Sequence, residues 1–275
     1  MRFTVLGSGS RGNATLVMAG STHLLIDAGF SGRELTRRMK SMGVTPEEID
    51  LVVLTHEHTD HVRGAGVFAR AHGTPLALTE GTLAACGKLF RGQETLRTYR
   101  PGRPFEVGDL RIEPFATVHD AADPVAMAVV EGASGLRLGV ATDLGRPTAL
   151  ARHVLAECDA LIVESNHDES LVWSAPYPPQ VKARIASSHG HLSNRAAAKL
   201  VCELLGPRLA VVVLAHLSVE SNRPDLAERT MRSALAGRGY LGDVLVASPT
   251  DPTDMIDLAK LRMASRGEQL PLLER

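Results

Sequence analysis

Leu51-Val-Val-Leu-Thr-His-Glu-His-Thr-Asp-His61 is the stretch that decides the fold of this 275-residue chain. Its first five residues form an apolar run of the length of a buried β-strand. Four side chains that can bind a metal follow at once: His56, His58, Asp60 and His61. Imidazole and carboxylate groups without a thiolate suit zinc, manganese or iron in a reactive site better than a structural zinc knot. The stretch therefore predicts a metal centre beyond the carboxyl end of a buried strand.

Three more metal-binding side chains follow apolar strands later in the chain. They are His119, Asp143 and His216. In sheets covered by helices, sites form beyond the carboxyl ends of strands, where the loops converge. We therefore expect all seven side chains to meet, and seven ligands are enough for two divalent ions that share a carboxylate and a water.

The rest of the pattern alternates strands with helices. The first half is rich in hairpins, and the second half alternates helix and strand, which predicts two sheets covered by helices. We expect one domain over residues 1–262, followed by a charged and flexible tail over 263–275. The expected strands are 3–6, 15–19, 23–26, 51–55, 76–78, 110–118, 125–131, 136–142, 160–163, 209–215 and 243–247, and the expected helices are 33–42, 62–71, 149–157, 194–205 and 224–236.

Composition excludes several classes of protein. Hydrophobic residues make up 44% and charged residues 22%, as in ordinary globular chains. The net charge of -1 excludes a globally basic nucleic-acid coat, although a local basic patch is compatible with it. Three cysteines without a C-x-x-C pair exclude a disulfide scaffold and favour a reducing compartment. The longest apolar run, 209–215, is too short for a membrane span, so we expect a cytoplasmic protein without membrane contact.

A basic segment lies between the metal motif and His119. From Lys88 to Arg103 it holds five cations against one acid, with Phe90 and Tyr99 between them. Basic residues interleaved with aromatics suit a nucleic-acid strand, through phosphate contacts and base stacking. A solvated basic surface explains the composition equally well. The candidate substrate contacts in this segment are Arg91, Arg97 and Arg100.

The order of the metal-binding residues resembles that of the metallo-β-lactamase-fold hydrolases. The matching elements are H-x-H-x-D-H at 56–61, a histidine after a strand, Thr-Asp-x-Gly at 142–145 and a late histidine. The resemblance implies an α/β fold, an αββα sandwich of two mixed β-sheets packed face to face with helices on the outer faces. It also implies that His56, His58 and His119 hold one ion, that Asp60, His61 and His216 hold the other, and that Asp143 bridges them.

Longer phrases resemble the YycJ (WalJ) family in particular. They are Gly7-Ser-Gly-Ser-Arg-Gly-Asn13, Glu164-Ser-Asn-His-Asp168, Tyr177-Pro178, Gly190-His-Leu-Ser-Asn194 and Leu214-Ala-His-Leu-Ser218. The resemblance implies a metal-dependent nuclease, described for that family as a 5′-to-3′ exonuclease on DNA, with a hydroxide between two ions (Zn²⁺ or Mn²⁺) as nucleophile. Two departures concern substrate contacts: Trp173-Ser-Ala175 stands where a glycine is expected before Tyr-Pro, and His189 is an additional histidine.

Further residues receive expected roles around this centre. By analogy with tRNase Z-type enzymes, His191 is expected to protonate the leaving oxygen. His167 follows the apolar strand 161–163 and is expected to contact the phosphate or to orient His191. The alternative for both is a structural histidine. Asp60 is counted with these catalytic candidates. Asp27 is expected to accept a hydrogen bond from a ligand histidine or from the backbone of the H-x-H loop, and Asp120 has the same expected role. The alternative for both is an ordinary turn aspartate. The Gly-rich loop with Ser10 and Asn13 either presents N–H groups to phosphate or is a simple hairpin turn; Asn166 and Ser193 complete the candidate substrate contacts.

Other functions fit the same ligands. A cyclic or other small phosphodiester is the main alternative substrate, and thioester or lactam hydrolysis is a weaker one. A non-catalytic metal-binding subunit is the alternative from another class, although the intact ligand set argues against a decayed site. The expected partner is nucleic acid, a single-stranded DNA end with RNA as the alternative, while the pattern carries no signal for oligomeric state.

Overall fold

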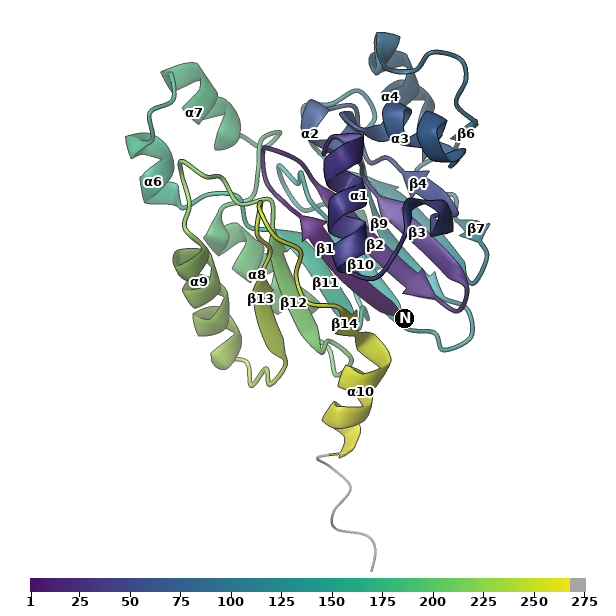
Figure 1. The fold of residues 1–275 in the computed structure, drawn as a ribbon. Helices are drawn as coiled ribbons and strands as arrows, with labels where there is room; N and C mark the ends of the chain where they lie inside the picture. The colour runs from purple at the N-terminus through teal and green to yellow at the C-terminus, as the bar shows by residue number, and fades with distance from the viewer. Residues whose placement is uncertain (268–275) are drawn as a thin grey trace, which may run out of the picture.

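Two seven-stranded β-sheets lie face to face in the computed structural model, which describes residues 1–267, and helices cover both outer faces (Figure 1). This is the αββα arrangement expected from the sequence. Both sheets are mixed, because one half of each is antiparallel and the other half is parallel.

The first sheet is built from the amino-terminal half of the chain and one late strand. Its order is β14-β1-β2-β3-β4-β5-β6, and its parallel half begins at the β3–β4 pair. The strands are β1 (Arg2–Gly7), β2 (Ala14–Ala19), β3 (Thr22–Ile26), β4 (Leu51–Val53), β5 (Leu76–Leu78), β6 (Leu96–Thr98) and β14 (Ile256–Asp257).

The second sheet comes from the rest of the chain. Its order is β13-β12-β11-β10-β9-β8-β7, and β10 to β13 are parallel. The strands are β7 (Phe105–Val107), β8 (Leu110–Ala116), β9 (Val125–Glu131), β10 (Arg137–Ala141), β11 (Ala160–Glu164), β12 (Val211–Ala215) and β13 (Asp243–Val246).

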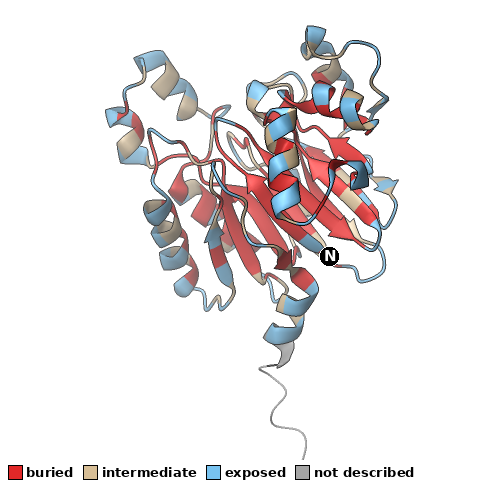
Figure 2. Ribbon diagram, viewed as in Figure 1, coloured by how far each residue is buried: buried red, intermediate tan, exposed pale blue. Residues whose placement is uncertain are grey.

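Three buried layers hold the sandwich together. One lies between the sheets, and each outer face carries another beneath its helices. Figure 2 shows the strands almost wholly buried, while the helices expose one side. The helices are α1 (Gly32–Ser41), η1 (Pro46–Glu48), α2 (Thr59–Val62), α3 (Ala65–His72), α4 (Glu80–Ala85), η2 (Gly87–Leu89), α5 (Ala149–Leu155), α6 (Glu169–Ser174), α7 (Pro179–Ile185), α8 (Asn194–Leu204), α9 (Pro224–Ala236) and α10 (Leu258–Gly267). None of the helices in this part of the chain is long and apolar enough to cross a membrane.

Several expected boundaries are wrong in detail. The single helix expected over 62–71 is two helices, α2 and α3, which meet at Gly64. A side chain at Gly64 would overlap the carbonyl of Phe30, so this close approach requires glycine. The short strands β6 and β7 and the helices α4, α6 and α7 were not expected. Helix α10 continues into the segment expected to be a tail, and residues 268–275 lie outside the described residues.

Candidate metal centre

The seven predicted ligands come from both sheets and meet at one edge of the sandwich. His56 and His58 follow β4, Asp60 and His61 lie on α2, and His119, Asp143 and His216 follow β8, β10 and β12. Because β4, β10 and β12 end at this edge, their short loops bring distant parts of the sequence together.

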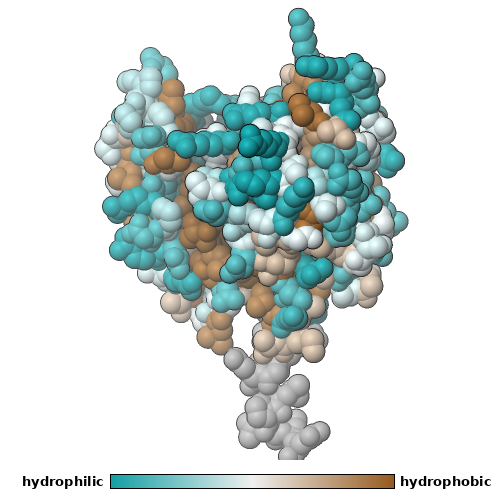
Figure 3. All heavy atoms as spheres, in the orientation of Figure 1, coloured by the Kyte–Doolittle hydropathy of each residue, from teal (hydrophilic) through white to brown (hydrophobic). Residues whose placement is uncertain are grey.

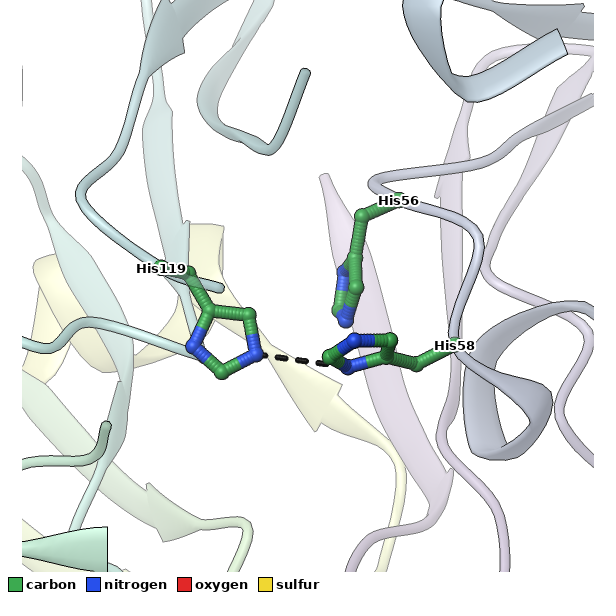
Figure 4. Close-up of side chains that lie close together, drawn as sticks. All are labelled: His56, His58 and His119. Carbon is green, nitrogen blue, oxygen red and sulfur yellow. Dashed lines mark hydrogen bonds between the residues drawn. The ribbon is translucent and has the colours of Figure 1, made fainter. Parts of the chain in front are cut away.

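One part of the centre consists of three imidazoles. His56, His58 and His119 point toward one another (Figure 4), and their ligand atoms lie within 4.8 Å of one another. His58 Nδ1 is 3.3 Å from His119 Nε2. Three facing ring nitrogens are a common ligand set for a divalent ion.

The other part adds carboxylates. Asp60 Oδ2 lies 3.3 Å from His216 Nε2 and 3.6 Å from His61 Nε2. Asp143 stands between the two parts: its Oδ2 is 3.2 Å from His61 Nε2, and its Oδ1 is 3.6 Å from His119 Nε2. The two oxygens of one carboxylate thus face the two groups of ligands.

Hydrogen bonds fix which nitrogen each histidine presents. His119 Nδ1 is 3.1 Å from the Gly190 carbonyl oxygen, and His61 Nδ1 is 2.7 Å from Asp27 Oδ2. These oxygens can only accept, so each Nδ1 carries the hydrogen and each Nε2 offers its lone pair to the centre. In the same way, Thr55 donates to Asp27 and accepts from His56 Nδ1. Such partners orient ligands and raise their basicity.

Two buried polar atoms in the centre have no hydrogen-bond partner. They are His56 Nε2 and Asp143 Oδ2. Leaving buried polar atoms unpaired costs about 1–3 kcal/mol each, so such atoms call for an explanation. A cation between the imidazoles and the carboxylates would satisfy both, and the residues therefore fit metal binding.

The charges agree with this arrangement. Burial lowers the pKa of His56 and His119, so these rings are neutral and able to ligate. Burial alone would also lower the pKa of His61, but the carboxylates of Asp27 and Asp143 outweigh it and raise that pKa to about 10. The centre therefore has excess negative charge that draws protons when no metal competes for the site.

The backbone is strained where the strands deliver these groups. Asp27, Asp143 and His216 have φ values of 62°, 57° and 56°, in the left-handed region. Each such non-glycine residue costs about 1–2 kcal/mol. Each one directly follows or lies within two residues of a strand end, and the turn aims its side chain at the centre.

Glu164, the last residue of β11, is the site residue that sequence reasoning missed. It is fully buried, and its Oε1 is 2.7 Å from His191 Nδ1 and 3.0 Å from His216 Nδ1. Its Oε2 accepts from the backbone N–H groups of Leu144 and Leu192. Burial alone would raise the pKa of Glu164, but His191 and His216 outweigh it and lower that pKa to about 2. The sequence did carry a signal for Glu164, because this acidic residue ends an apolar strand. The other predicted ligands likewise follow apolar strands.

Comparison with known proteins agrees with this geometry. The family model described as "Beta-lactamase superfamily domain" matches residues 22–216. The exodeoxyribonuclease WalJ of Streptococcus pneumoniae is 33% identical over 94% of this chain and 98% of its own, and the exodeoxyribonuclease YycJ of Bacillus anthracis is 32% identical over 92% and 96%. This chain belongs to the WalJ/YycJ family of the β-lactamase superfamily. The fold resembles that of YhfI from Bacillus subtilis, with a TM-score of 0.70 at 19% identity over 92% of this chain and 99% of the other.

Two histidines outside the predicted ligand set border the centre of this WalJ/YycJ-family chain. The ring of His191 is centred 5.1 Å from that of His119 and also 5.1 Å from that of His216. Burial disfavours its charged form, but Glu164 outweighs this and raises the pKa of His191. His167 is buried nearby, forms a backbone bridge with Ser193, and has an Nδ1 atom without a partner.

The two aspartates expected to hold ligands differ. Asp27 Oδ2 accepts a hydrogen bond from His61 Nδ1. Asp120 lies 3.3 Å from His119 Nε2, the nitrogen that faces the centre, and pairs with Arg184. The Gly190 carbonyl accepts from His119 Nδ1 and orients the ring, and the role predicted for Asp120 stays a prediction.

The polar residues expected to contact substrate are mostly occupied. Asn13 is buried, accepts from Ser8 and Gly9, and turns its Nδ2 toward Asp60 and His61. Asn166 donates to the His216 carbonyl, and Ser193 caps α8. These three side chains support the loops of the centre, and their contact with substrate stays a prediction. Ser10 is exposed in the β1–β2 turn, at the tip of the Gly-rich loop.

The basic segment contains both exposed and buried residues, and its Arg100 Nη2 lies 3.8 Å from Glu80 Oε1. Arg91, Arg97 and Arg100 are exposed, and Arg100 follows the carboxyl end of β6, on the same edge as the metal-binding loops. Tyr99, by contrast, is buried and donates to the Leu54 carbonyl. The base stacking expected from Tyr99 is therefore wrong, because its ring belongs to the core.

Proposed function

We propose that this protein is a metal-dependent exonuclease that shortens single-stranded DNA in the 5′-to-3′ direction. The observation that carries the proposal is the placement of Asp143, with one oxygen toward each of two ligand groups. The near full-length similarity to two exodeoxyribonucleases supports nucleic acid as the substrate class.

We assign two divalent ions, Zn²⁺ or Mn²⁺, to the centre. His56, His58 and His119 would hold one ion and Asp60, His61 and His216 the other, with Asp143 shared. Bound there, the ions supply an activated water and offset the charge of the phosphodiester. The protein keeps the imidazoles in the required tautomers and excludes bulk water beneath them.

His191 is placed to act as the general acid. Its Nδ1 hydrogen is held by Glu164 at 2.7 Å, which leaves Nε2 as the second donor of the charged ring. The raised pKa favours the protonated form of this ring, which can pass a proton to the leaving oxygen. His167, whose buried Nδ1 has no hydrogen-bond partner, is assigned to the phosphate or to orienting His191.

We propose that the DNA strand approaches the metal centre along the side of the first sheet where β6 lies. Arg97, Arg100 and Arg103 line a cavity of about 440 Å³ together with Phe105. Arginines beside an aromatic ring suit phosphates and bases of an unpaired strand. Replacing Arg97 and Arg100 by alanine should weaken binding of single-stranded DNA and reduce its salt dependence, while hydrolysis of a small phosphodiester stays unchanged. Unchanged binding and cleavage of single-stranded DNA in this variant would favour a small-molecule phosphodiesterase.

We also infer a cytoplasmic location. The three cysteines, Cys86, Cys158 and Cys202, are all free thiols, as expected of a protein that works under reducing conditions.

The deciding experiment compares 5′-labelled and 3′-labelled single-stranded DNA and RNA with Mn²⁺, Zn²⁺ or a chelator, with His58→Ala as the inactive control. We expect stepwise, metal-dependent release of nucleotides from the 5′ end of DNA, abolished in the variant. Release from the 3′ end would reverse the polarity, preference for RNA would change the substrate, and cleavage equal to that of the variant would refute the nuclease.

A further inference from the structure

We propose that Trp173 is a base-stacking subsite that holds the unpaired strand beside the metal centre. The inference rests on the proposed function, and it adds a residue that touches the substrate. It begins from the segment between His167 and His191, which forms α6 and α7.

Both ends of this α6–α7 arm are built into the centre. At its start, His167 pairs with Ser193 through a backbone bridge. At its end, the Gly190 carbonyl holds His119 Nδ1 at 3.1 Å. Figure 1 shows the arm standing out beyond the sheets on one side, with α2 and α4 on the other, and Figure 3 shows a lower and mainly hydrophilic surface between the two projections.

Trp173 is the single tryptophan of the chain, and it is 59% exposed. All ten aromatic residues lie in the described part of the chain, and Trp173 is the only one in it that is exposed. An indole left in water forgoes the large stabilisation of aromatic burial, so an exposed tryptophan beside a reactive site indicates a contact surface.

The position of Trp173 on α6 indicates which way this residue faces relative to the metal centre. Glu169 lies four residues earlier, hence on the same face of the helix. Its Oε1 accepts from Ser193 Oγ at 3.0 Å, so this face is turned toward the amino-terminal end of α8, where His191 and Ser193 lie. A DNA strand whose end reaches the metal-binding residues would therefore pass this face of α6.

The α6–α7 arm also places a positive charge at the backbone of Trp173 and links its two helices. Lys182 Nζ, on α7, donates to the Trp173 carbonyl at 2.6 Å and ties the two helices together. This contact places the ammonium group at the backbone of Trp173, and the group has further hydrogens to offer a phosphate. A flat ring and a cation on the same arm suit an unpaired DNA strand, which offers them its bases and its phosphates.

Stacking suits an exonuclease in particular. Every base has a π face, so a stacking platform accepts any sequence as the strand advances. Duplex bases are already stacked on one another, so the same platform favours single strands. The contact should affect binding of the strand more than the chemical step.

The test uses the fluorescence of this one tryptophan. His58→Ala protein in chelator, which does not cleave, is titrated with a thymidine oligomer of about ten nucleotides and with an abasic oligomer of equal length. We expect the base-containing oligomer to quench the emission and to bind about tenfold more tightly than the abasic one. Fluorescence anisotropy of labelled oligomers extends the measurement to variants that lack the tryptophan. Adding Trp173→Phe should largely keep the preference for the base-containing oligomer, whereas adding Trp173→Ala should abolish it.

Kinetics give a second measure in the active protein. Trp173→Ala should raise KM for the oligomer about tenfold with little change in kcat, and it should not affect a small aryl phosphodiester. Leu241→Ala is the matched control, because Leu241 is 94% exposed beside the amino-terminal end of β13, away from the arm.

The outcomes separate this inference from the proposed function. Wild-type cleavage with unchanged KM in Trp173→Ala and no quenching would overturn the subsite and leave the nuclease standing. Quenching by the oligomer in a protein that never cleaves DNA would support the subsite and refute the nuclease. A change of oligomeric state in Trp173→Ala, without a change in DNA affinity, would assign the indole to a subunit contact and overturn the inference.

Discussion

Replacing Glu164 by glutamine tests how the centre controls its histidines. One carboxylate oxygen lies 2.7 Å from His191 Nδ1 and 3.0 Å from His216 Nδ1. The other accepts from the N–H groups of Leu144 and Leu192 at 3.0 and 2.9 Å. The substitution keeps size and shape while it removes the charge and adds two hydrogens.

The glutamine amide must turn so that its NH₂ group does not face the two backbone N–H donors. Its oxygen will take the side of the two backbone N–H groups, and its NH₂ group will face both histidines. Each Nδ1 must then accept, so the hydrogen of His216 moves to Nε2, the nitrogen that faces Asp60. The loss of charge also lowers the pKa of His191 and leaves less of the acid form at neutral pH.

We expect metal affinity of the Asp60–His61–His216 group to fall about 10- to 100-fold. Cleavage should fall by at least about 100-fold, because a general acid is affected as well. Metal content after dialysis against a metal buffer and kcat at saturating metal measure the two effects. Glu203→Gln, which alters a surface ion pair with Arg152, is the matched control. Glu164→Asp should restore part of both properties, because it keeps the charge.

The result that would refute this reasoning is a Glu164→Gln protein that binds metal and cleaves DNA within about threefold of wild type. Circular dichroism and thermal unfolding of both variants exclude loss of the fold as the cause.

Three other predictions follow from the same structure. At pH 8, metal binding to chelator-treated protein should release protons, because the pKa of His61 is raised to about 10 and its proton must leave before metal binds. Calorimetry in buffers of different ionisation enthalpy counts these protons, affinity should rise with pH up to that value, and heat independent of the buffer would contradict the shift. Gly29→Ala should destabilise the fold by about 2 kcal/mol or more, since its Cβ would overlap the Asp60 carbonyl; an unchanged melting temperature would show that the loop yields freely. Tyr99→Phe should cost about 1–2 kcal/mol of unfolding free energy in urea, through the hydrogen bond lost at Leu54, while cleavage stays as in wild type; reduced DNA binding would restore a substrate role for this ring.

The metal centre could be predicted largely because its ligands share one local signal. Each follows an apolar strand, and parallel strands end at one edge, so proximity follows from topology. The order of strands within each sheet could not be derived in this way, because pairing depends on packing between segments distant in sequence.

The residues around the ligands were predicted less well, for a physical reason. Tyr99 and Asn13 have side chains that suit either a substrate contact or a buried hydrogen bond, and composition does not distinguish these environments. The Gly190 carbonyl carries no side-chain signal at all, yet it orients His119. The short helices α6 and α7 also lack a sustained apolar period, since the longer has seven residues.

The most direct test of the account is titration of metal-free protein with Mn²⁺ or Zn²⁺ while cleavage of 5′-labelled single-stranded DNA is followed. The account predicts that activity rises to a plateau at two equivalents of metal, and that Asp143→Ala, which removes the shared carboxylate, never reaches it. Full cleavage without metal, or a plateau at one equivalent that Asp143→Ala also reaches, would contradict the two-metal centre.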